Sequence, residues 1–271
     1  MSGPGPADFI KGRAFDPPLA RGFRPQASTA EKDPRTEPGA LADPVVADAV
    51  VRLNRVTKTF NGSGPGTTAL REVSIEVLPG EMVLLLGPSG SGKTTLLTLA
   101  AGLARPTAGS VTLFGRCVEH TPASELQRLR AKSIGFVFQT FLLIDALTAE
   151  ENVALALRFA GGRRSERAGK ARRLFYDLDI APLARRLPRT MSQGEKQRVA
   201  IARALANDPA LVLADEPTGS LETRQGFDVI RLLHGQAKAR NAALIVASHD
   251  LRLKEFADRT LRLQDGALTG M

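Results

Sequence analysis

The chain is poor in the residues that stabilise secreted or membrane-spanning proteins. It has one cysteine, Cys117, so it cannot form an internal disulfide, which favours a reducing compartment. It has no tryptophan and a single tyrosine. No apolar run reaches the roughly 18 residues that a membrane helix needs, and the first residues lack a cleavable signal pattern. We therefore expect synthesis in the cytosol, with any attachment to a membrane provided by a partner.

Residues 1–49 differ in composition from the rest of the chain. They are rich in proline, glycine and alanine and show little hydrophobic periodicity, so we expect a disordered tail. Their six basic and seven acidic side chains sum to −1, so the net charge of +9 leaves +10 on residues 50–271. The 43% hydrophobic content of the chain is enough for one large core, or for a core with a subdomain.

Much of the positive charge lies in residues 158–189, which hold ten Arg or Lys and three Asp or Glu. One interpretation is attraction to anionic lipid headgroups beneath a transporter. We favour the simpler one, a solvated helical face. Only Phe159, Phe175 and Tyr176 could stack on bases in this stretch, and no nucleic-acid module is recognisable, so we expect no nucleic-acid partner.

A glycine-rich segment stands between two apolar segments. Residues 82–86 are typical of a buried parallel strand, and residues 95–101 have a helical pattern. The segment between them fits the phosphate-loop pattern, and its N–H groups and the helix start can hold a phosphate chain. The alternative is a chance glycine-rich turn, but that does not explain why a strand precedes the segment and a helix follows it. We predict that a nucleoside triphosphate is bound by Gly87, Pro88, Ser89, Gly90, Ser91, Gly92, Lys93, Thr94 and Thr95.

Two adjacent carboxylates, Asp215 and Glu216, follow the apolar strand at 211–214. A carboxylate there can orient the waters of a Mg²⁺ ion that the Thr94 hydroxyl ligates, while Lys93 reaches the β- and γ-phosphates. Glu216 should point to the other face of the strand end, towards an attacking water. A solvated strand end is the alternative, but adjacent carboxylates there are costly unless charged partners meet them.

Residues 191–198 (Met-Ser-Gln-Gly-Glu-Lys-Gln-Arg) stand where ATP-binding-cassette (ABC) ATPases carry the signature Leu-Ser-Gly-Gly-Gln and a following Gln-Arg. With the phosphate loop and the strand that ends in Asp-Glu-Pro at 215–217, this segment makes the chain resemble the ABC family over residues 50–268. The order of the motifs is most similar to the branch that powers lipoprotein release, macrolide export and related envelope exporters. The combination is very specific.

The resemblance implies an α/β fold: a P-loop NTPase (RecA-like) core with a parallel sheet, an antiparallel β-lobe and an inserted α-helical subdomain. We expect one ABC ATPase domain over residues 50–271, with the helical subdomain at about 141–190. The residue pattern supports each part. Residues 51–53, 73–77 and 110–115 alternate like antiparallel strands, and 261–268 like a hairpin with an Asp-Gly turn. Short apolar runs at 134–138, 211–214 and 244–247 favour a parallel sheet, and Thr148 with Glu151 predicts a capping box.

The resemblance also implies catalytic roles. Glu216 matches the general base of the family. Gln139, after the strand at 134–138, matches the Gln loop, whose amide touches Mg²⁺ or the attacking water while residues 140–147 face a membrane partner. His249 matches the switch histidine that contacts the γ-phosphate. Without the resemblance, a Gln or a His at a strand end would be read as an ordinary residue.

Phe60 stands near the position where the family places an aromatic ring that stacks on adenine, commonly Tyr. A phenylalanine ring has the π face that stacking needs. The alternative is a core aromatic of the β-lobe.

Ser192 and Gly194 open a helix that we expect over residues 195–206, so their N–H groups and the Ser192 hydroxyl can form a second anion site. In the family, two domains pair head to tail and each signature closes the nucleotide of its partner, so one cassette in this chain implies a homodimer. Gln193 and Glu195 depart from the signature, although Gln193 is tolerable at negative φ. Glu222 stands where the dimer-contact loop ends in Asp.

The resemblance therefore implies an ATPase subunit that uses ATP and Mg²⁺ to drive a separate integral-membrane permease from the cytoplasmic face of the inner membrane. The alternative is a mechanically acting ABC ATPase of the cell-division type, which transmits conformation without moving a solute. DNA-repair cassettes place long coiled coils between phosphate loop and signature, for which residues 95–191 leave no room. Translation-factor cassettes normally occur twice in a chain, and this chain has one.

Overall fold

The computed structural model describes residues 49–60 and 66–269. The tail predicted at 1–49 lies outside the described residues except for Ala49, so its disorder stays a prediction. Within the described part of the chain, no helix is long and apolar enough to cross a bilayer.

A six-stranded sheet forms the centre of the fold, in the order β10-β9-β3-β8-β7-β6. The five strands from β9 to β6 are parallel, and β10 pairs antiparallel with β9. All residues of β3 and β8 are buried, because helices or the second sheet cover both faces. The strands are Met82–Leu86 (β3), Ile134–Val137 (β6), Leu211–Asp215 (β7), Ala243–Ser248 (β8), Arg259–Gln264 (β9) and Ala267–Leu268 (β10).

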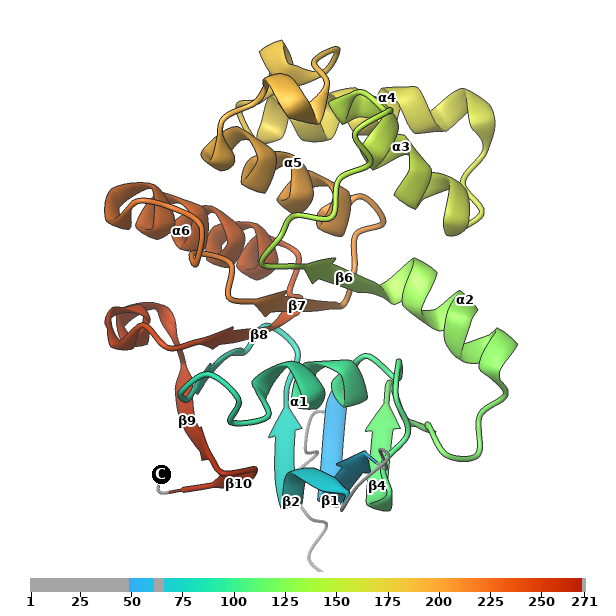
Figure 1. Ribbon diagram of the computed structural model, residues 1–271. Coiled ribbons are helices and arrows are strands. Elements are labelled where there is room, and N and C mark those ends of the chain that lie inside the picture. Colours follow the sequence, from blue (N-terminus) through green and yellow to red (C-terminus); the bar gives the residue numbers. More distant parts are fainter. Residues whose placement is uncertain (1–48, 61–65, 270–271) are drawn as a thin grey trace, which may run out of the picture. The chain divides into compact units, whose positions relative to one another are not determined.

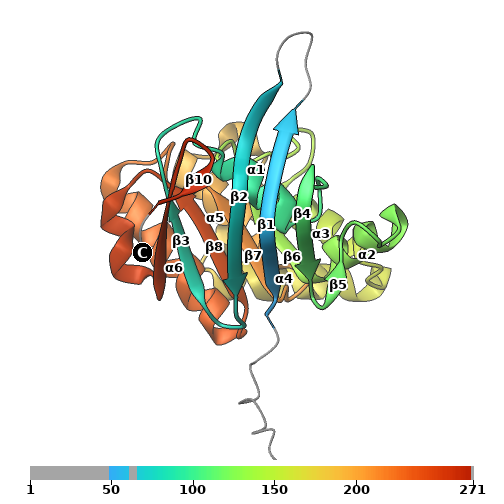
Figure 2. The same ribbon diagram turned by 90° about the horizontal axis from the view of Figure 1, so that it is seen from below.

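A four-stranded antiparallel sheet in the order β2-β1-β4-β5 packs beside this core. Val51 lies opposite Val77 and Leu53 opposite Ile75, so the apolar residues of both long strands share one face. The predicted β-lobe is confirmed, and Figure 2 shows its strands side by side. The strands are Val51–Phe60 (β1), Thr67–Val77 (β2), Ala108–Leu113 (β4) and Arg116–Cys117 (β5).

Helices cover the central sheet on both faces. Helix α1 (Lys93–Ala100) lies between the sheet and the β-lobe, whereas α3, α4 and α5 gather on the opposite face (Figure 1). The capping box predicted at Thr148 and Glu151 starts α3. The other helices are α2 (Ala123–Ser133), α3 (Ala149–Phe159), α4 (Arg164–Asp177), α5 (Gln193–Leu205), α6 (Thr223–Ala239) and the 3₁₀ turns Ala181–Leu183, Pro188–Thr190 and Leu251–Phe256.

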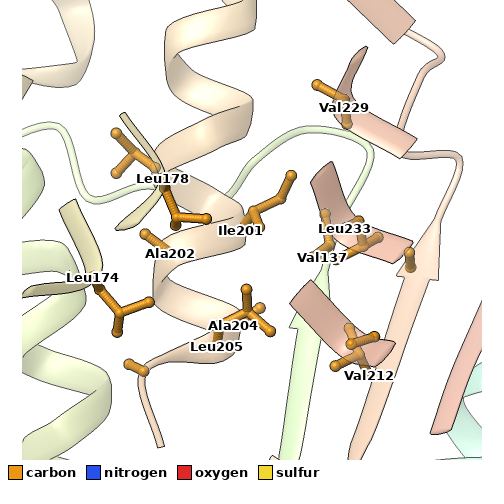
Figure 3. Close-up of a cluster of buried hydrophobic side chains, with 14 of the residues drawn as sticks. Val137, Leu174, Leu178, Ile201, Ala202, Ala204, Leu205, Val212, Val229 and Leu233 are labelled. Atoms are coloured by element: carbon orange, nitrogen blue, oxygen red, sulfur yellow. The ribbon is translucent and has the colours of Figure 1, made fainter. Parts of the chain in front are cut away.

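The core has two parts, one on each face of the central sheet. Along β3, Met82, Leu84 and Leu86 pack with the helices α3 to α6, while Val83 and Leu85 pack with α1 and the β-lobe. This division follows from the two-residue period of a strand. Figure 3 shows how the first part joins β6 and β7 to α4, α5 and α6 through Val137, Leu174, Leu178, Ile201, Ala202, Ala204, Leu205, Val212, Val229 and Leu233.

One helix start differs from the sequence prediction in a way that affects the site. The helix predicted to start at Glu195 starts at Gln193, because Ser192 and Glu195 form a capping box that the prediction did not use. The hairpin predicted at 261–268 is present with its turn at Asp265 and Gly266. Its first strand, β9, also pairs with β3, so the hairpin extends the central sheet.

Candidate functional site

The glycine-rich loop connects the buried strand β3 to helix α1 and curls tightly against its neighbours. Gly90 and Gly92 have φ of 79° and 104°, in the left-handed region that side chains disfavour. A Cβ at Gly92 would lie 2.4 Å from the carbonyl oxygen of Ala69, and one at Gly87 would lie 2.3 Å from that of Leu263. Larger residues at these positions would therefore push the loop away from β2 and β9.

Lys93, the first residue of α1, is almost fully buried at the centre of the loop. Its Nζ donates to the carbonyl oxygens of Gly87 and Pro88 at 2.8 and 3.0 Å. It also lies 3.4 Å from Oε1 of Glu216, whose Oε2 is 3.0 Å from Nδ1 of His249. The Glu216 carboxylate thus has a cation on one side and an imidazole on the other, which excludes the simple solvated strand end.

The side chains of Asp215 and Glu216 contact different partners, as expected because successive side chains of a strand point to opposite faces. The Thr94 hydroxyl donates to Oδ2 of Asp215 at 2.7 Å. Burial raises the pKa of the Asp215 carboxyl. The nearby Glu216 carboxylate also raises this pKa, whereas the hydrogen bond from Thr94 lowers it. Glu216 has φ of 46°, so the chain is strained where it leaves β7.

These groups line one open cavity of about 640 Å³. Gln139 reaches it from the loop after β6, and His249 from the end of β8. Segments far apart in the sequence therefore meet where the parallel strands end, as ligand sites in such sheets do. The lining consists of Ala69, Pro88, Ser89, Gly90, Gly92, Lys93, Thr94, Thr95, Gln139, Asp215, Glu216 and His249.

Phe60 is outside the residues that line this cavity. It ends β1 with 51% of its surface exposed, which rules out the alternative of a core aromatic. The Nζ of Lys58 lies 5.2 Å from the centre of its ring, so one face of the ring already meets a cation. Adenine stacking on Phe60 stays a prediction.

The signature residues lie at the start of α5 and are held by a local network. The Ser192 hydroxyl accepts from the N–H of Glu195 at 3.2 Å, and Oε2 of Glu195 accepts from the N–H of Ser192 at 2.7 Å. Nη1 of Arg186 donates to Oε1 of Glu195 at 2.8 Å. The Ser192 backbone, Arg186 and the hydroxyl together lower the pKa of Glu195. The N–H of Ser192 is thus occupied, which corrects the expectation that it faces an anion.

A second cavity, of about 390 Å³, borders the signature at Ser192, Gly194 and Glu195. It shares no lining residue with the cavity at the phosphate loop. In the described chain, the phosphate loop and the signature therefore border different cavities.

Comparison with known proteins identifies the fold and the motifs together. The family model described as ABC transporter matches residues 70–219, which include the phosphate loop, the signature and the strand end at Asp215. The chain belongs to the ABC transporter family. It is an ABC ATPase subunit that binds and hydrolyses ATP, as the motifs indicate.

The relatives of this ABC ATPase match it over most of its length. The lipoprotein-releasing system ATP-binding protein LolD 2 of Caulobacter vibrioides is 43% identical, over 84% of this chain and 98% of its own. The macrolide export ATP-binding/permease protein MacB of Agrobacterium fabrum is 36% identical, over 82% of this chain and 34% of its own. The predicted similarity to this branch is confirmed.

Solved structures support the same fold. The dimeric ATP-binding cassette MJ0796, in a post-hydrolysis state with ADP and Pi, superposes with a TM-score of 0.75 at 37% identity. The match covers 81% of this chain and 97% of the cassette. The predicted α/β P-loop NTPase fold is confirmed.

The structure shows where the three departures from the family pattern, Gln193, Glu195 and Glu222, lie. Gln193 is the first residue of α5 and is not among the described residues with positive φ, so the conformation does not require glycine. Glu222 precedes α6 as its N-cap residue, and its side chain makes no capping hydrogen bond.

Three polar residues near the site were missed by sequence reasoning. Gln197 is fully buried in α5, and its Nε2 donates to the carbonyl oxygen of Pro217, the residue after Glu216. Asn152 and Arg203 bind the backbone of the loop that follows Gln139. A polar residue among the apolar positions of a helix was the one available signal, and it does not identify the partner.

Proposed function

We propose that this ABC ATPase drives a separate membrane permease by closing as a head-to-tail homodimer on ATP and Mg²⁺. The observation that carries the proposal is the single cavity in which Lys93, Thr94, Asp215, Glu216 and His249 meet. The dimeric cassette MJ0796 and the transporter relatives support the paired arrangement. The whole of residues 50–271 acts as the ATPase domain, and residues 141–190 as its helical subdomain.

The donor set at the cavity fits Mg²⁺. The Thr94 hydroxyl and the Asp215 carboxylate are hard oxygen donors within 2.7 Å of each other, and the Gln139 amide lines the same cavity. A bound Mg²⁺ would neutralise charge that develops on the phosphates. Thr94 would hold it directly, and Asp215 and Gln139 would orient its waters.

The protein residues divide the remaining work. Loop N–H groups and Lys93 hold the phosphates, and Glu216 accepts the proton of the attacking water. His249 sits on the outer side of Glu216 with 69% of its side chain exposed, where it can reach the γ-phosphate. The Nζ of Lys93 lies 3.4 Å from Oε1 of Glu216 and helps to orient that carboxylate.

The surface around the loop after Gln139 suits a permease. Leu142 and Ile144 are 54% and 44% exposed and Phe159 is 71% exposed, beside a shallow apolar groove that includes Phe136 and Phe138. A patch of this kind marks a protein partner. This chain would then sit at the cytoplasmic face of the membrane, beneath its permease.

The test uses Glu216→Gln, which keeps the shape of the side chain and removes proton acceptance. We expect ATP turnover to fall about 10²–10⁴-fold while ATP still binds, because the loop and Thr94 are unchanged. The variant should then accumulate a closed dimer, seen by size exclusion with Mg-ATP, alone and with the co-purified permease. Turnover near the wild-type rate contradicts the mechanism. Loss of turnover without a dimer in the permease-bound form leaves the base in place but contradicts the paired closure.

A further inference from the structure

The loop that follows Gln139, residues 139–148, is held from one side by a buried asparagine. Asn152 is 1% exposed, and its Nδ2 donates to the carbonyl oxygens of Ile144, Leu147 and Thr148 at 3.2, 3.1 and 3.0 Å. Its Oδ1 accepts from the N–H of Ile144 at 2.8 Å. Since Asn152 belongs to α3, these bonds fasten the far half of the loop to the helix that continues from it.

The near half of the loop is held by a residue of a different helix. Nη2 of Arg203, in α5, donates to the carbonyl oxygen of Phe141 at 2.8 Å, and Nη1 donates to that of Leu142. Phe141 and Leu142 have φ of 62° and 48°. Two successive non-glycine residues in the left-handed region are unfavourable and persist only where the surroundings impose them. The guanidinium fork binds the two carbonyl groups that this conformation presents.

Arg203 therefore connects the two halves of the catalytic apparatus. The N-terminus of α5 carries the signature residues Ser192 and Gly194, and Arg203 lies about 16 Å along the same helix at 1.5 Å per residue. At its other end the contact reaches Phe141, two residues from Gln139 in the nucleotide cavity. A displacement of α5 is thus transmitted by hydrogen bonds to the loop that carries Gln139.

We propose that Arg203 is a positioning residue for ATP hydrolysis, which fixes the Gln139 loop to the signature helix so that both move together. The inference rests on the proposed function and adds to it a route between signature and cavity. Arg203 is not among the residues that line the nucleotide cavity. Its effect on turnover passes through Gln139.

The chemistry of this contact requires arginine. Burial lowers the pKa of Arg203, which shows that its charge is partly withdrawn from water. A partly desolvated cation is retained where several acceptors satisfy it, and the planar fork offers two parallel donors to two carbonyl groups. A lysine could reach one of them with a single point charge.

The chain offers a matched control for a merely structural arginine. Nη1 of Arg130, in α2, donates to the carbonyl oxygen of Gly102 at 2.8 Å, and burial lowers its pKa as well. Arg130 thus also donates from a partly buried guanidinium to a backbone carbonyl, although it is less buried than Arg203 and this bond has one acceptor instead of two. Its partner follows α1 and lies outside the Gln139 loop.

The experiment compares steady-state ATPase kinetics of the full chain and of Arg203→Gln, Arg203→Lys and Arg130→Gln, with thermal melts of each. For Arg203→Gln we expect kcat to fall about 10- to 100-fold, since misplacing a positioned group by about 1 Å has effects of this size. The KM for ATP should stay within about twofold, because the phosphates are held by the glycine-rich loop. Arg203→Lys should fold normally and recover part of the rate, and Arg130→Gln should keep at least half of it.

Each result decides the inference. It is overturned if Arg203→Gln keeps its kcat within about twofold, if Arg130→Gln loses as much, or if KM rises with kcat unchanged. If Arg203→Gln does not fold, an Arg203→Lys variant that folds and hydrolyses ATP at the wild-type rate overturns it too. A folded wild-type chain without ATPase activity overturns the proposed function as well, so the two failures are distinguishable.

Discussion

The helices α1 and α5 both begin at sites that we assign to phosphate, yet their first turns are built differently. Helix α1 begins after Gly92 in the left-handed conformation, and among the described residues no side chain caps it and no acidic residue lies in its first turn. Helix α5 begins after Ser192 with a complete capping box, and Glu195 lies in its first turn. The first four N–H groups of any helix need acceptors from outside it.

This difference separates two ways to bind a phosphate. The start of α1 keeps its N–H groups and its dipole for a ligand, so the nucleotide itself serves as the cap. At the start of α5 the capping box occupies the N–H groups of Ser192 and Glu195, and the Glu195 carboxylate is balanced by Arg186. We therefore expect α1 to bind ATP within one chain, and α5 to add a weaker contact that matters when two chains close.

The largest effect is expected for Lys93→Ala at the start of α1, the helix that no described side chain caps. Loss of this buried cation removes the group that reaches the β- and γ-phosphates, so we expect both ATP binding and turnover to be abolished. Isothermal titration with Mg-ATP and a phosphate-release assay measure the two effects. ATP affinity within about twofold of wild type would show that α1 is not the primary phosphate site.

A smaller effect is expected at the capped start of α5, where two capping boxes can be compared. Ser192→Ala and Thr148→Ala each remove the hydroxyl of a capping box, so each should cost about 1 kcal/mol of stability. In the proposed dimer the Ser192 hydroxyl faces the nucleotide of the partner chain, so we expect only Ser192→Ala to slow turnover, by about tenfold. Chemical denaturation and ATPase assays separate the two consequences. Equal turnover in both variants would reduce Ser192 to a helix cap.

The smallest effect is a change in the melting temperature when Asp215, which accepts a hydrogen bond from Thr94 in the first turn of α1, is replaced. Its pKa is raised in the folded state, so its ionisation lowers the free energy of unfolding as pH rises from its unfolded to its folded pKa. Asp215→Asn removes this loss and keeps an acceptor for Thr94. We expect a melting temperature higher by a few degrees at pH 7 and unchanged well below the unfolded pKa of about 3.9. An Asn variant less stable than wild type at pH 7 would contradict the assigned burial cost, although its Mg-ATPase activity should still fall.

The sequence predicts those parts of the site whose geometry is local. The strand, glycine-rich loop and helix around Lys93 are adjacent in the chain, and the Thr148 capping box spans three residues. Ser192 and Glu195 have the same spacing as Thr148 and Glu151 and form a second capping box, at the start of α5. The helix therefore begins two residues before the predicted start at Glu195, and the Ser192 N–H, which we expect from the sequence to face an anion, donates to the Glu195 carboxylate.

The contacts that position the catalytic residues are not local and could not be predicted. Arg203 and Phe141 are 62 residues apart, and Gln197 and Pro217 are 20 apart. A polar residue on an apolar helix face indicates a buried partner without identifying it. The positive φ of Phe141, Leu142 and Glu216 could not be predicted either, because these residue types do not favour that conformation.

The order of strands in the central sheet has a consequence for how the protein is made. Strand β3, which supports the glycine-rich loop, lies between β8 and β9, whose residues follow it by more than 150 positions. At about 5–20 residues per second on the ribosome, β3 waits roughly ten to thirty seconds before a neighbour in its sheet emerges. The ATP site, whose main motif is synthesised early, is therefore among the last parts of the domain to become native. Until then, the apolar strand β3 lacks its neighbours in the sheet and is exposed to aggregation.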